Sequence, residues 1–205
     1  MRKRARLIST VAVATWVAAA AATVHATAPA AAQPLPQLPG VMTMSPPRVV
    51  GDLDMTDQNG ARKRLADFAG APALVFFGFT HCPEVCPTTL QKLAQIKRTQ
   101  AKELQGLRIV LISVDGERDT PAVLKEFLKR FSADFVGLTA PAAEVRNLAL
   151  QFSAPFFKDP PRNGEYQVQH SSRIYALDKQ GRLRAELYDV SVEATGGIGR
   201  ALLAE

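Results

Sequence analysis

The amino-acid sequence predicts an α/β domain whose central mixed β-sheet is flanked by helices. Residues 73–79 form a continuous apolar run, which is typical of a strand buried on both faces of a sheet, and residues 107–114 predict a second buried strand. Between them, residues 88–104 repeat apolar side chains at helical spacing. Near the end of the chain, Asp-Lys-Gln-Gly at residues 178–181 separates two further strand-like segments and indicates a late hairpin.

Local signals predict two more elements. Asp-Gln-Asn-Gly at residues 57–60 predicts an N-terminal hairpin between two short polar strands. Thr120 and Pro121 predict the start of a helix, because threonine caps a first turn and proline is tolerated there. The apolar face expected for this helix consists of Val123, Leu124, Phe127, Leu128 and Phe131.

The rest of the domain is predicted to continue the alternation of strands and helices. We expect a strand at 135–138, a helix at 142–152, the late hairpin strands at 173–177 and 183–187, and a closing helix at 191–203. Gly196, Gly197 and Gly199 weaken the helical signal of the last segment, because glycine is a poor helix former.

Length and charge limit the number of domains and exclude one class of partner. The chain has 205 residues, which is enough for one domain with a substantial core but hardly for two. Of its 25 cations and 19 acids, four cations lie within the first six residues, and the remaining 21 leave a net charge of only +2. The basic character belongs to the N-terminus, so we predict no nucleic-acid partner.

The N-terminal segment has the three parts of an export signal. Basic residues 1–6 precede a weakly apolar run at 7–24, and small-residue cleavage sites follow at 24–26 and 30–32. No cysteine lies near these sites, which argues against a lipoprotein anchor. We therefore predict that residues 1–32 are either a cleaved export signal or an uncleaved N-terminal membrane anchor. In both cases the domain faces the periplasm.

A proline-rich linker is predicted between this segment and the domain. Residues 33–47 contain five prolines, which is typical of an extended tether, so the folded domain is expected to span 48–205. Met42 and Met44 lie within the linker. Their thioethers suit a transient Cu(I) contact, although methionines also occur in linkers without any such role.

The chain has only two cysteines, Cys82 and Cys86, which follow the apolar run at 73–79. A structural disulfide is the usual interpretation in an exported protein. Closing so small a loop, however, stabilises a fold by only about 2 kcal/mol. Helical side chains four residues apart have Cβ atoms about 5–6 Å apart, whereas a disulfide needs about 3.5–4.5 Å. The pair closes only if Cys82 lies in the loop or if the first helical turn distorts. Two thiols that can either bond together or hold something between them suit redox or metal chemistry.

The position of the pair favours the thiolate form. A helix N-terminus lowers the pKa of a thiol, although the negative charge of Glu84 acts in the opposite direction. His170 opens an expected strand at 169–175 and is a candidate third ligand, or else an ordinary polar residue. His81 is expected to point away from the sulfur atoms. Two thiolates and one imidazole suit Cu(I) and accept Cu(II), whereas zinc usually takes a fourth ligand.

The segment that carries the cysteines resembles a known family. Residues 78–87, with the sequence GFTHCPEVCP, closely resemble the signature of the Sco/SenC copper proteins. The similarity runs in order from about Val50 to Leu203, and it includes DGERDTP at 115–121 and His-Ser-Ser at 170–172.

This resemblance implies a thioredoxin-like fold in which copper, as Cu(I), Cu(II) or both, is bound by Cys82, Cys86 and His170. Members of the family assemble the binuclear copper (CuA) centre of cytochrome c oxidase, so the resemblance implies a metallochaperone. The implied partners are the oxidase subunit that carries CuA, a periplasmic copper donor and a thiol reductant.

The chain departs from the family pattern at three places. Gly116 replaces a common proline, and residues 139–140 replace a usual glycine. Gln169 stands where many members have an aspartate, which could orient the neighbouring imidazole. The roles of Asp115 and Arg118 stay open between shaping the copper loop, forming a docking surface and capping the next helix.

Two functional classes remain after this comparison, a copper carrier and a thiol–disulfide oxidoreductase. In the second, Cys82 attacks a disulfide and Cys86 resolves it, reducing the cysteines of the oxidase copper site or of other exported proteins. Dedicated thioredoxin-like oxidoreductases use a Cys-x-x-Cys pair, and the resemblance implies that a cis-proline faces it. This chain instead has a three-residue spacer between its cysteines and no proline at 169–170. A peroxiredoxin fits less well, because Thr80 is only two residues before Cys82. We therefore predict a carrier first and a reductase second.

Overall fold

The computed structural model describes residues 33–205, which form an eight-stranded sheet, a small two-stranded sheet and four α-helices. The strands are β1 (Val41–Arg48), β2 (Met55–Asp57), β3 (Arg62–Lys63), β4 (Ala73–Gly78), β5 (Arg108–Ser113), β6 (Val136–Thr139), β7 (Phe157–Lys158), β8 (Val168–Gln169), β9 (Ile174–Leu177) and β10 (Leu183–Leu187). The α-helices are α1 (Val85–Thr99), α2 (Pro121–Lys129), α3 (Ala142–Gln151) and α4 (Val192–Ala204), and a 3-10 turn spans Leu65–Phe68.

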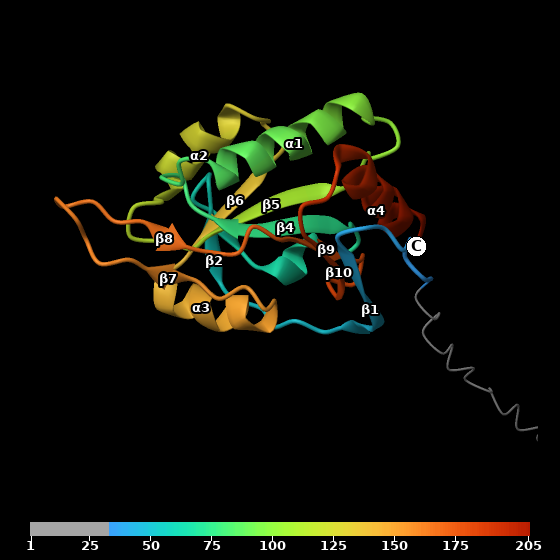
Figure 1. Ribbon diagram of the computed structural model, residues 1–205, viewed down its shortest axis with the longest axis horizontal. Coiled ribbons are helices and arrows are strands. Elements are labelled where there is room, and N and C mark those ends of the chain that lie inside the picture. The colour runs from blue at the N-terminus through green and yellow to red at the C-terminus, as the bar shows by residue number, and fades with distance from the viewer. Residues whose placement is uncertain (1–32) are drawn as a thin grey trace, which may run out of the picture. The chain divides into compact units, whose positions relative to one another are not determined.

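The large sheet is mixed, as the sequence predicts. Its order is β1-β10-β9-β4-β5-β6-β2-β3, in which β4, β5 and β6 are parallel and the other neighbours antiparallel. The crossovers from β4 to β5 and from β5 to β6 run through α1 and α2. Both steps proceed in the same direction across the sheet, so right-handed connections put both helices on one face. Figure 1 shows α4 on this face as well and α3 on the opposite face. The predicted thioredoxin-like α/β fold is thereby confirmed.

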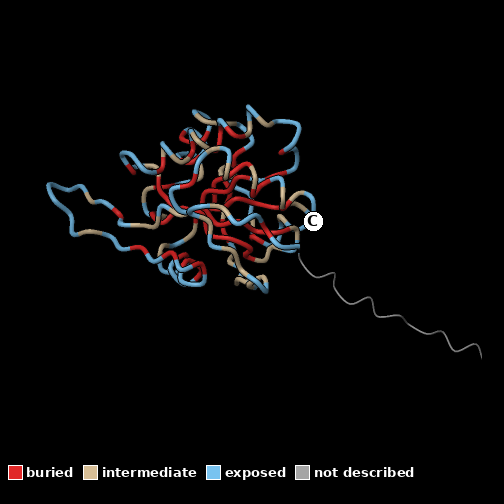
Figure 2. Tube along the Cα trace, turned by 45° about the vertical axis from the view of Figure 1, so that its right-hand side comes forward, coloured by how far each residue is buried: buried red, intermediate tan, exposed pale blue. Residues whose placement is uncertain are grey.

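The core lies on both faces of the central strands. Every residue of β4 is buried, which explains its unbroken apolar sequence. On the α3 face, Phe77 packs edge-to-face against Phe152 and Tyr175, with ring centroids 5.3 and 5.8 Å away. Figure 2 shows this burial concentrated in the central strands, with the exposed connections around them. The same strands therefore hold the loops at their ends in fixed positions.

The predicted N-terminal hairpin, the late hairpin and the closing helix are all present, as β2–β3, β9–β10 and α4. The glycines of α4 have a packing role that the propensity argument missed. A Cβ atom on Gly199 would lie 2.8 Å from Cδ2 of Leu107, so glycine lets α4 approach the segment that leads into β5. The cap predicted for α2 is also found, because Thr120 Oγ1 accepts a hydrogen bond from the Val123 backbone N–H.

Three sequence-based expectations need correction. The linker predicted at 33–47 is wrong in its second half, because Val41–Arg48 forms the edge strand β1 and pairs with β10. The apolar face predicted for α2 is too wide, because Val123 is 38% exposed and Phe131 is only partly buried. Helix α1 begins at Val85 and ends at Thr99, earlier at both ends than the periodicity predicts.

The predicted export signal or anchor, residues 1–32, lies outside the residues that the structure describes. Within residues 33–205, no helix combines the length and the apolar character needed to cross a bilayer.

The aromatic packing on the α3 face of the sheet predicts that Phe152 contributes strongly to stability. Replacing Phe152 by alanine removes a fully buried ring that contacts both Phe77 and Tyr175. We expect the free energy of unfolding to fall by about 3–5 kcal/mol, measured by urea denaturation. Phe157→Ala is the matched control, because Phe157 is 60% exposed and its loss should change stability by less than about 0.5 kcal/mol. Equal losses in the two variants would contradict this account of the core.

Candidate metal centre

The two cysteines lie where β4 turns into α1. Cys82 is in the connecting loop, and its backbone N–H donates to the Phe79 carbonyl at 3.3 Å. Cys86 is in the first turn of α1, and its N–H donates to Cys82 Sγ at 3.4 Å. Both thiols are free and buried. The pair is thus open, with Cys82 in the loop position that a disulfide would require.

Gly78 makes room for the second sulfur. A Cβ atom at this position would lie 2.6 Å from Cys86 Sγ and 3.2 Å from Cδ1 of Leu111. Any side chain on the last residue of β4 would therefore push Cys86 out of its place. Sequence reasoning gave Gly78 no separate role, although a glycine ending an otherwise bulky apolar strand was a usable signal.

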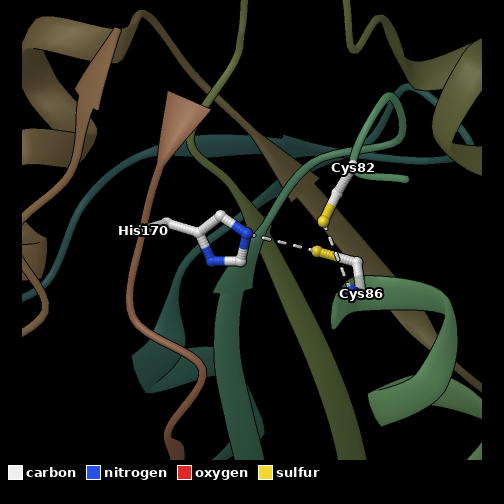
Figure 3. Close-up of side chains that lie close together, drawn as sticks. All are labelled: Cys82, Cys86 and His170. Carbon is white, nitrogen blue, oxygen red and sulfur yellow. Dashed lines mark hydrogen bonds between the residues drawn. The ribbon is translucent and has the colours of Figure 1, made fainter. Parts of the chain in front are cut away.

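His170 reaches the sulfur atoms from a different part of the chain. The strand expected at 169–175 is wrong as a single element, because β8 ends at Gln169 and β9 begins at Ile174. His170 lies in the connection between them, and its Nε2 is 3.6 Å from Cys86 Sγ. Figure 3 shows the imidazole directed at the two thiols, with dashed lines joining the three residues.

The tautomer of His170 follows from its second hydrogen bond. Nδ1 lies 2.9 Å from the backbone carbonyl oxygen of Ser171. A carbonyl oxygen can only accept, so Nδ1 carries the hydrogen and donates it. Nε2 of the neutral ring is then left with its lone pair facing the sulfurs, which is the form that binds a metal.

The three ligand atoms have the spacing of a low-coordinate metal site. Cys82 Sγ, Cys86 Sγ and a ring nitrogen of His170 all lie within 4.8 Å of one another. Zinc gives a scale for such a site, because its bonds to sulfur and nitrogen measure about 2.3 and 2.0 Å. With these bond lengths, ligands at 120° around the ion would have their sulfur and nitrogen atoms about 3.7 Å apart. The separation of 3.6 Å between Cys86 and His170 is close to this value. The donor set therefore fits a soft metal ion with little rearrangement.

The two thiols differ in acidity because of their mutual contact. The hydrogen bond from the Cys86 thiol lowers the pKa of Cys82. The same hydrogen bond, together with burial, raises the pKa of Cys86. Cys82 is therefore the thiolate of the pair. Cys86 keeps its proton until it binds a metal ion or forms a disulfide.

Gln169, which stands at the position of the expected aspartate, does not orient the imidazole of His170. Its side-chain Nε2 donates to Asp159 Oδ2 at 2.8 Å, across the small β7–β8 sheet. The backbone carbonyl of Ser171 orients the imidazole instead. The Gln169 amide thus links the two strands of the β7–β8 hairpin and makes no contact that would orient His170.

A buried carboxylate fixes the cysteine loop to β5. Asp119 accepts hydrogen bonds from the backbone N–H of Thr80 at 3.0 Å, from the Thr80 hydroxyl at 2.6 Å and from the Ser113 hydroxyl at 2.7 Å. Burial raises the pKa of Asp119, and these hydrogen bonds oppose the shift. The exposed His81 lies on this side, with Nδ1 3.1 Å from the Thr80 hydroxyl. It belongs to a cluster with Asp115 and Asp119, not to the one formed by the two thiols and His170.

That cluster of His81, Asp115 and Asp119 is better explained as scaffold than as a second metal site. The oxygens of Asp119 are already occupied by three donors. Asp115 accepts from Arg118 Nε at 2.5 Å and from the Tyr166 hydroxyl at 2.7 Å. Neither Asp115 nor Arg118 caps α2, because the side chain of Thr120 fills that role.

The acidity of the thiols predicts how they react with an alkylating reagent. An ordinary thiol, with a pKa of about 8.5, loses reactivity about tenfold per pH unit in acid. Because the pKa of Cys82 is lowered, we expect its alkylation by iodoacetamide to continue with little loss from pH 8 to pH 6. Cys86 should stay unmodified over this range. Peptide mass spectrometry would measure both rates.

The Cys86→Ala variant is the control for this pH profile. It removes the hydrogen bond that contributes most to the low pKa of Cys82, so the steep pH dependence of an ordinary thiol should return. A wild-type profile as steep as that of the variant would contradict the proposed difference between the two thiols.

Comparisons with known proteins show which proteins this chain is similar to. Residues 41–195 match the family model described as SCO1/SenC. The SCO2-like protein of Rickettsia felis is 34% identical over 146 residues, which cover 69% of this chain and 70% of that protein. ScoI of Bradyrhizobium japonicum with copper bound is similar in structure, with a TM-score of 0.69 and 35% identity over 75% of this chain and 99% of that one. Yeast Sco1 with copper bound gives a TM-score of 0.67 and 30% identity, covering 73% of this chain and 85% of that one.

Proposed function

This chain belongs to the SCO1/SenC family, and from that premise we propose that it is a copper metallochaperone. In this proposal Cys82, Cys86 and His170 bind one copper ion, and the protein delivers it to the CuA site of cytochrome c oxidase during assembly. The observation that carries the proposal is the triangle of two thiols and one imidazole nitrogen, whose atoms lie within 4.8 Å of one another.

The chemistry of the ligands supports copper as the cargo. Thiolates are soft donors that bind Cu(I) well, and imidazole also suits Cu(II). Among the described residues, no fourth histidine, cysteine or acid joins the triangle, whereas structural zinc sites almost always have four ligands. The ring nitrogen that faces the sulfurs has a free lone pair, and Cys82 is already inclined to the thiolate form.

The location of the site supports release to another protein. The thiols are buried, but His170 is only partly buried and lines a shallow surface groove with Phe157, Gln169 and Ser172. An incoming ligand therefore approaches from the His170 side and replaces the imidazole first. Transfer by successive ligand exchange needs no free copper ion at any stage.

The cellular setting is part of the same proposal. Residues 1–32 carry the features of an export signal, so we place the domain in the periplasm, free after cleavage or anchored to the inner membrane. The acceptor in this proposal is the CuA-bearing subunit of the oxidase. A periplasmic copper donor and a thiol reductant keep the carrier loaded and reduced.

Copper binding by the purified full chain tests the first half of the proposal. We expect one equivalent of copper after passage over a competing chelator, and a thiolate-to-copper charge-transfer band in the Cu(II) form. The double variant Cys82→Ala/Cys86→Ala should lose both. His170→Ala should keep the thiolates but shift the band, and it should weaken copper binding by more than the roughly 10- to 100-fold that is typical for loss of a group that only supports a ligand.

His81→Ala is the matched control, because His81 adjoins Cys82 in sequence but contacts Thr80 and Asp119. It should bind copper like the wild type. Copper binding that is indifferent to His170, or that depends equally on His81, would overturn the assignment of the ligands.

A second candidate function, reduction of disulfides, is favoured by the open thiol pair. Cys82 would attack one sulfur of a substrate disulfide and release the other as a thiolate. Cys86, after losing its proton, would attack Cys82 and release the second substrate thiolate. The substrate gains two electrons, and the pair becomes a disulfide that a periplasmic reductant must reopen.

Mixing with a soluble CuA-bearing domain separates the two functions. When the copper-loaded chain meets the domain with its cysteines reduced, we expect the absorption bands of the CuA centre to appear as copper leaves the carrier. When the metal-free chain meets the same domain in its disulfide form, a reductase would reduce one acceptor disulfide per chain and so produce two free acceptor thiols. Thiol production without any copper transfer would refute delivery and leave the reductase.

A further inference from the structure

His170 is carried by a hairpin that stands apart from the main sheet. Strands β7 and β8 pair only with each other, and the segment that joins them extends away from the domain in Figure 1. His170 follows directly after β8. The hairpin therefore sets where the imidazole lies, and its attachment to the domain matters for the metal centre.

Three residues, Asp115, Arg118 and Tyr166, attach this hairpin to the loop that follows β5, and we refer to them as the hairpin clamp. The Tyr166 hydroxyl donates to Asp115 Oδ1 at 2.7 Å, and Arg118 Nε donates to Asp115 Oδ2 at 2.5 Å. Arg118 Nη1 also donates to the backbone carbonyl of Tyr166 at 3.2 Å. The guanidinium carbon of Arg118 lies 3.6 Å from the centre of the Tyr166 ring, a close cation–π stack.

A second basic residue strengthens the attachment from the hairpin side. Lys158 Nζ lies 3.9 Å from the centre of the same Tyr166 ring. It also forms an ion pair with Glu117 Oε2 at 2.6 Å, in the loop that follows β5. Tyr166 is thus held between two cations, one from each side of the junction.

The clamp reaches His170 through Phe79. The Phe79 ring packs edge-to-face against the imidazole, with centroids 5.6 Å apart, and the Arg118 guanidinium lies 5.8 Å from the same ring. The Phe79 carbonyl meanwhile accepts the hydrogen bond from the Cys82 backbone. One aromatic residue therefore contacts the clamp, the imidazole and the loop of the first cysteine.

We propose that Arg118 and Tyr166 are positioning residues for copper, because they hold His170 at coordination distance from the two thiols. Neither residue is among the proposed ligands. The inference rests on the proposed function, since it concerns the retention of copper at that site. It also assigns a role to Arg118 and Asp115, for which the sequence left several alternatives open.

Two anchors divide the task of orienting His170. On its C-terminal side, the Ser171 carbonyl fixes the tautomer, and the Ser171 hydroxyl accepts hydrogen bonds from the Tyr175 hydroxyl and the Arg173 backbone N–H. On its N-terminal side, the clamp fixes the hairpin four residues before the imidazole. Loss of the clamp should therefore move the ring away from the sulfurs without changing which nitrogen carries the hydrogen.

The test compares Tyr166→Leu, which removes both the hydroxyl and the ring, with Tyr166→Phe, which keeps the stack. Arg118→Lys is compared with Arg130→Lys. Arg130 stacks on Phe127 at 4.6 Å in a similar cation–π contact, but it lies on the far end of α2. For Tyr166→Leu we expect copper release to a chelator about tenfold faster than in the wild type. Its Cu(II) charge-transfer band should move toward that of His170→Ala.

The conservative variants make the interpretation specific. Tyr166→Phe, which loses only the hydroxyl bond to Asp115, should release copper at a rate between those of the wild type and Tyr166→Leu. Arg118→Lys should release copper faster than the wild type, and Arg130→Lys at the wild-type rate. Thermal unfolding of each variant would show whether the fold is retained. Wild-type release and an unchanged band in Tyr166→Leu would overturn the proposal, as would equal effects of Arg118→Lys and Arg130→Lys.

A metal-free measurement separates this proposal from the proposed function. Nuclear Overhauser contacts between the rings of Phe79 and His170 should be present in the wild type and lost in Tyr166→Leu. Their persistence in the variant would refute the clamp even if copper binds. If the wild type bound no copper, the proposed function would fail, and these contacts would still decide whether the clamp positions the imidazole.

Discussion

The hydrogen bond from His170 Nδ1 to the Ser171 carbonyl is the constraint on which the rest of the centre depends. It selects one tautomer, and it leaves the Nε2 lone pair directed at the sulfur of Cys86, 3.6 Å away. Without it, either nitrogen could carry the hydrogen, and an N–H group facing the thiols could not bind a metal. A backbone carbonyl performs this role without adding a charge beside the thiolate. The side chain of Gln169 is thereby free to bind Asp159.

The same geometry explains why a copper carrier and a thiol reductase are hard to distinguish in this fold. Both functions need two thiols within reach of each other, one of them ionised at neutral pH. The hydrogen bond between the cysteines provides the difference in pKa. What separates the functions is the third group, because copper binding needs the imidazole lone pair as a ligand, whereas disulfide exchange would use it only as a base for the Cys86 proton. The position of His170 therefore favours the carrier.

The sequence predicted the elements that depend on local or strongly patterned signals, but not those that depend on distant partners. Buried strands, the turns of both hairpins and the Thr120 cap all follow from neighbouring residues. Strand β1 was missed because Pro46 and Pro47 suggest a linker, whereas an edge strand tolerates proline and its pairing is set by β10. The connection that holds His170 was mistaken for a strand, because the pairing of β8 depends on the distant β7. The ligand triangle was predicted only through family resemblance, since spacing alone cannot bring residue 170 to residues 82 and 86.

A carrier must bind its ion firmly and then release it, and the division of the ligands between two elements suits both needs. Asp119 and the Phe79 carbonyl hold the cysteine loop to the rigid centre of the sheet, where each residue of β4 is buried. The imidazole comes from a small hairpin whose attachment is polar and lies nearer the surface. A partner that competes for the clamp, or that pushes on the hairpin, would withdraw one ligand while leaving two in place. In the proposed carrier, the ion would then stay bound to the thiolates until the acceptor supplies its own sulfur, and the fold itself would set the order of ligand exchange.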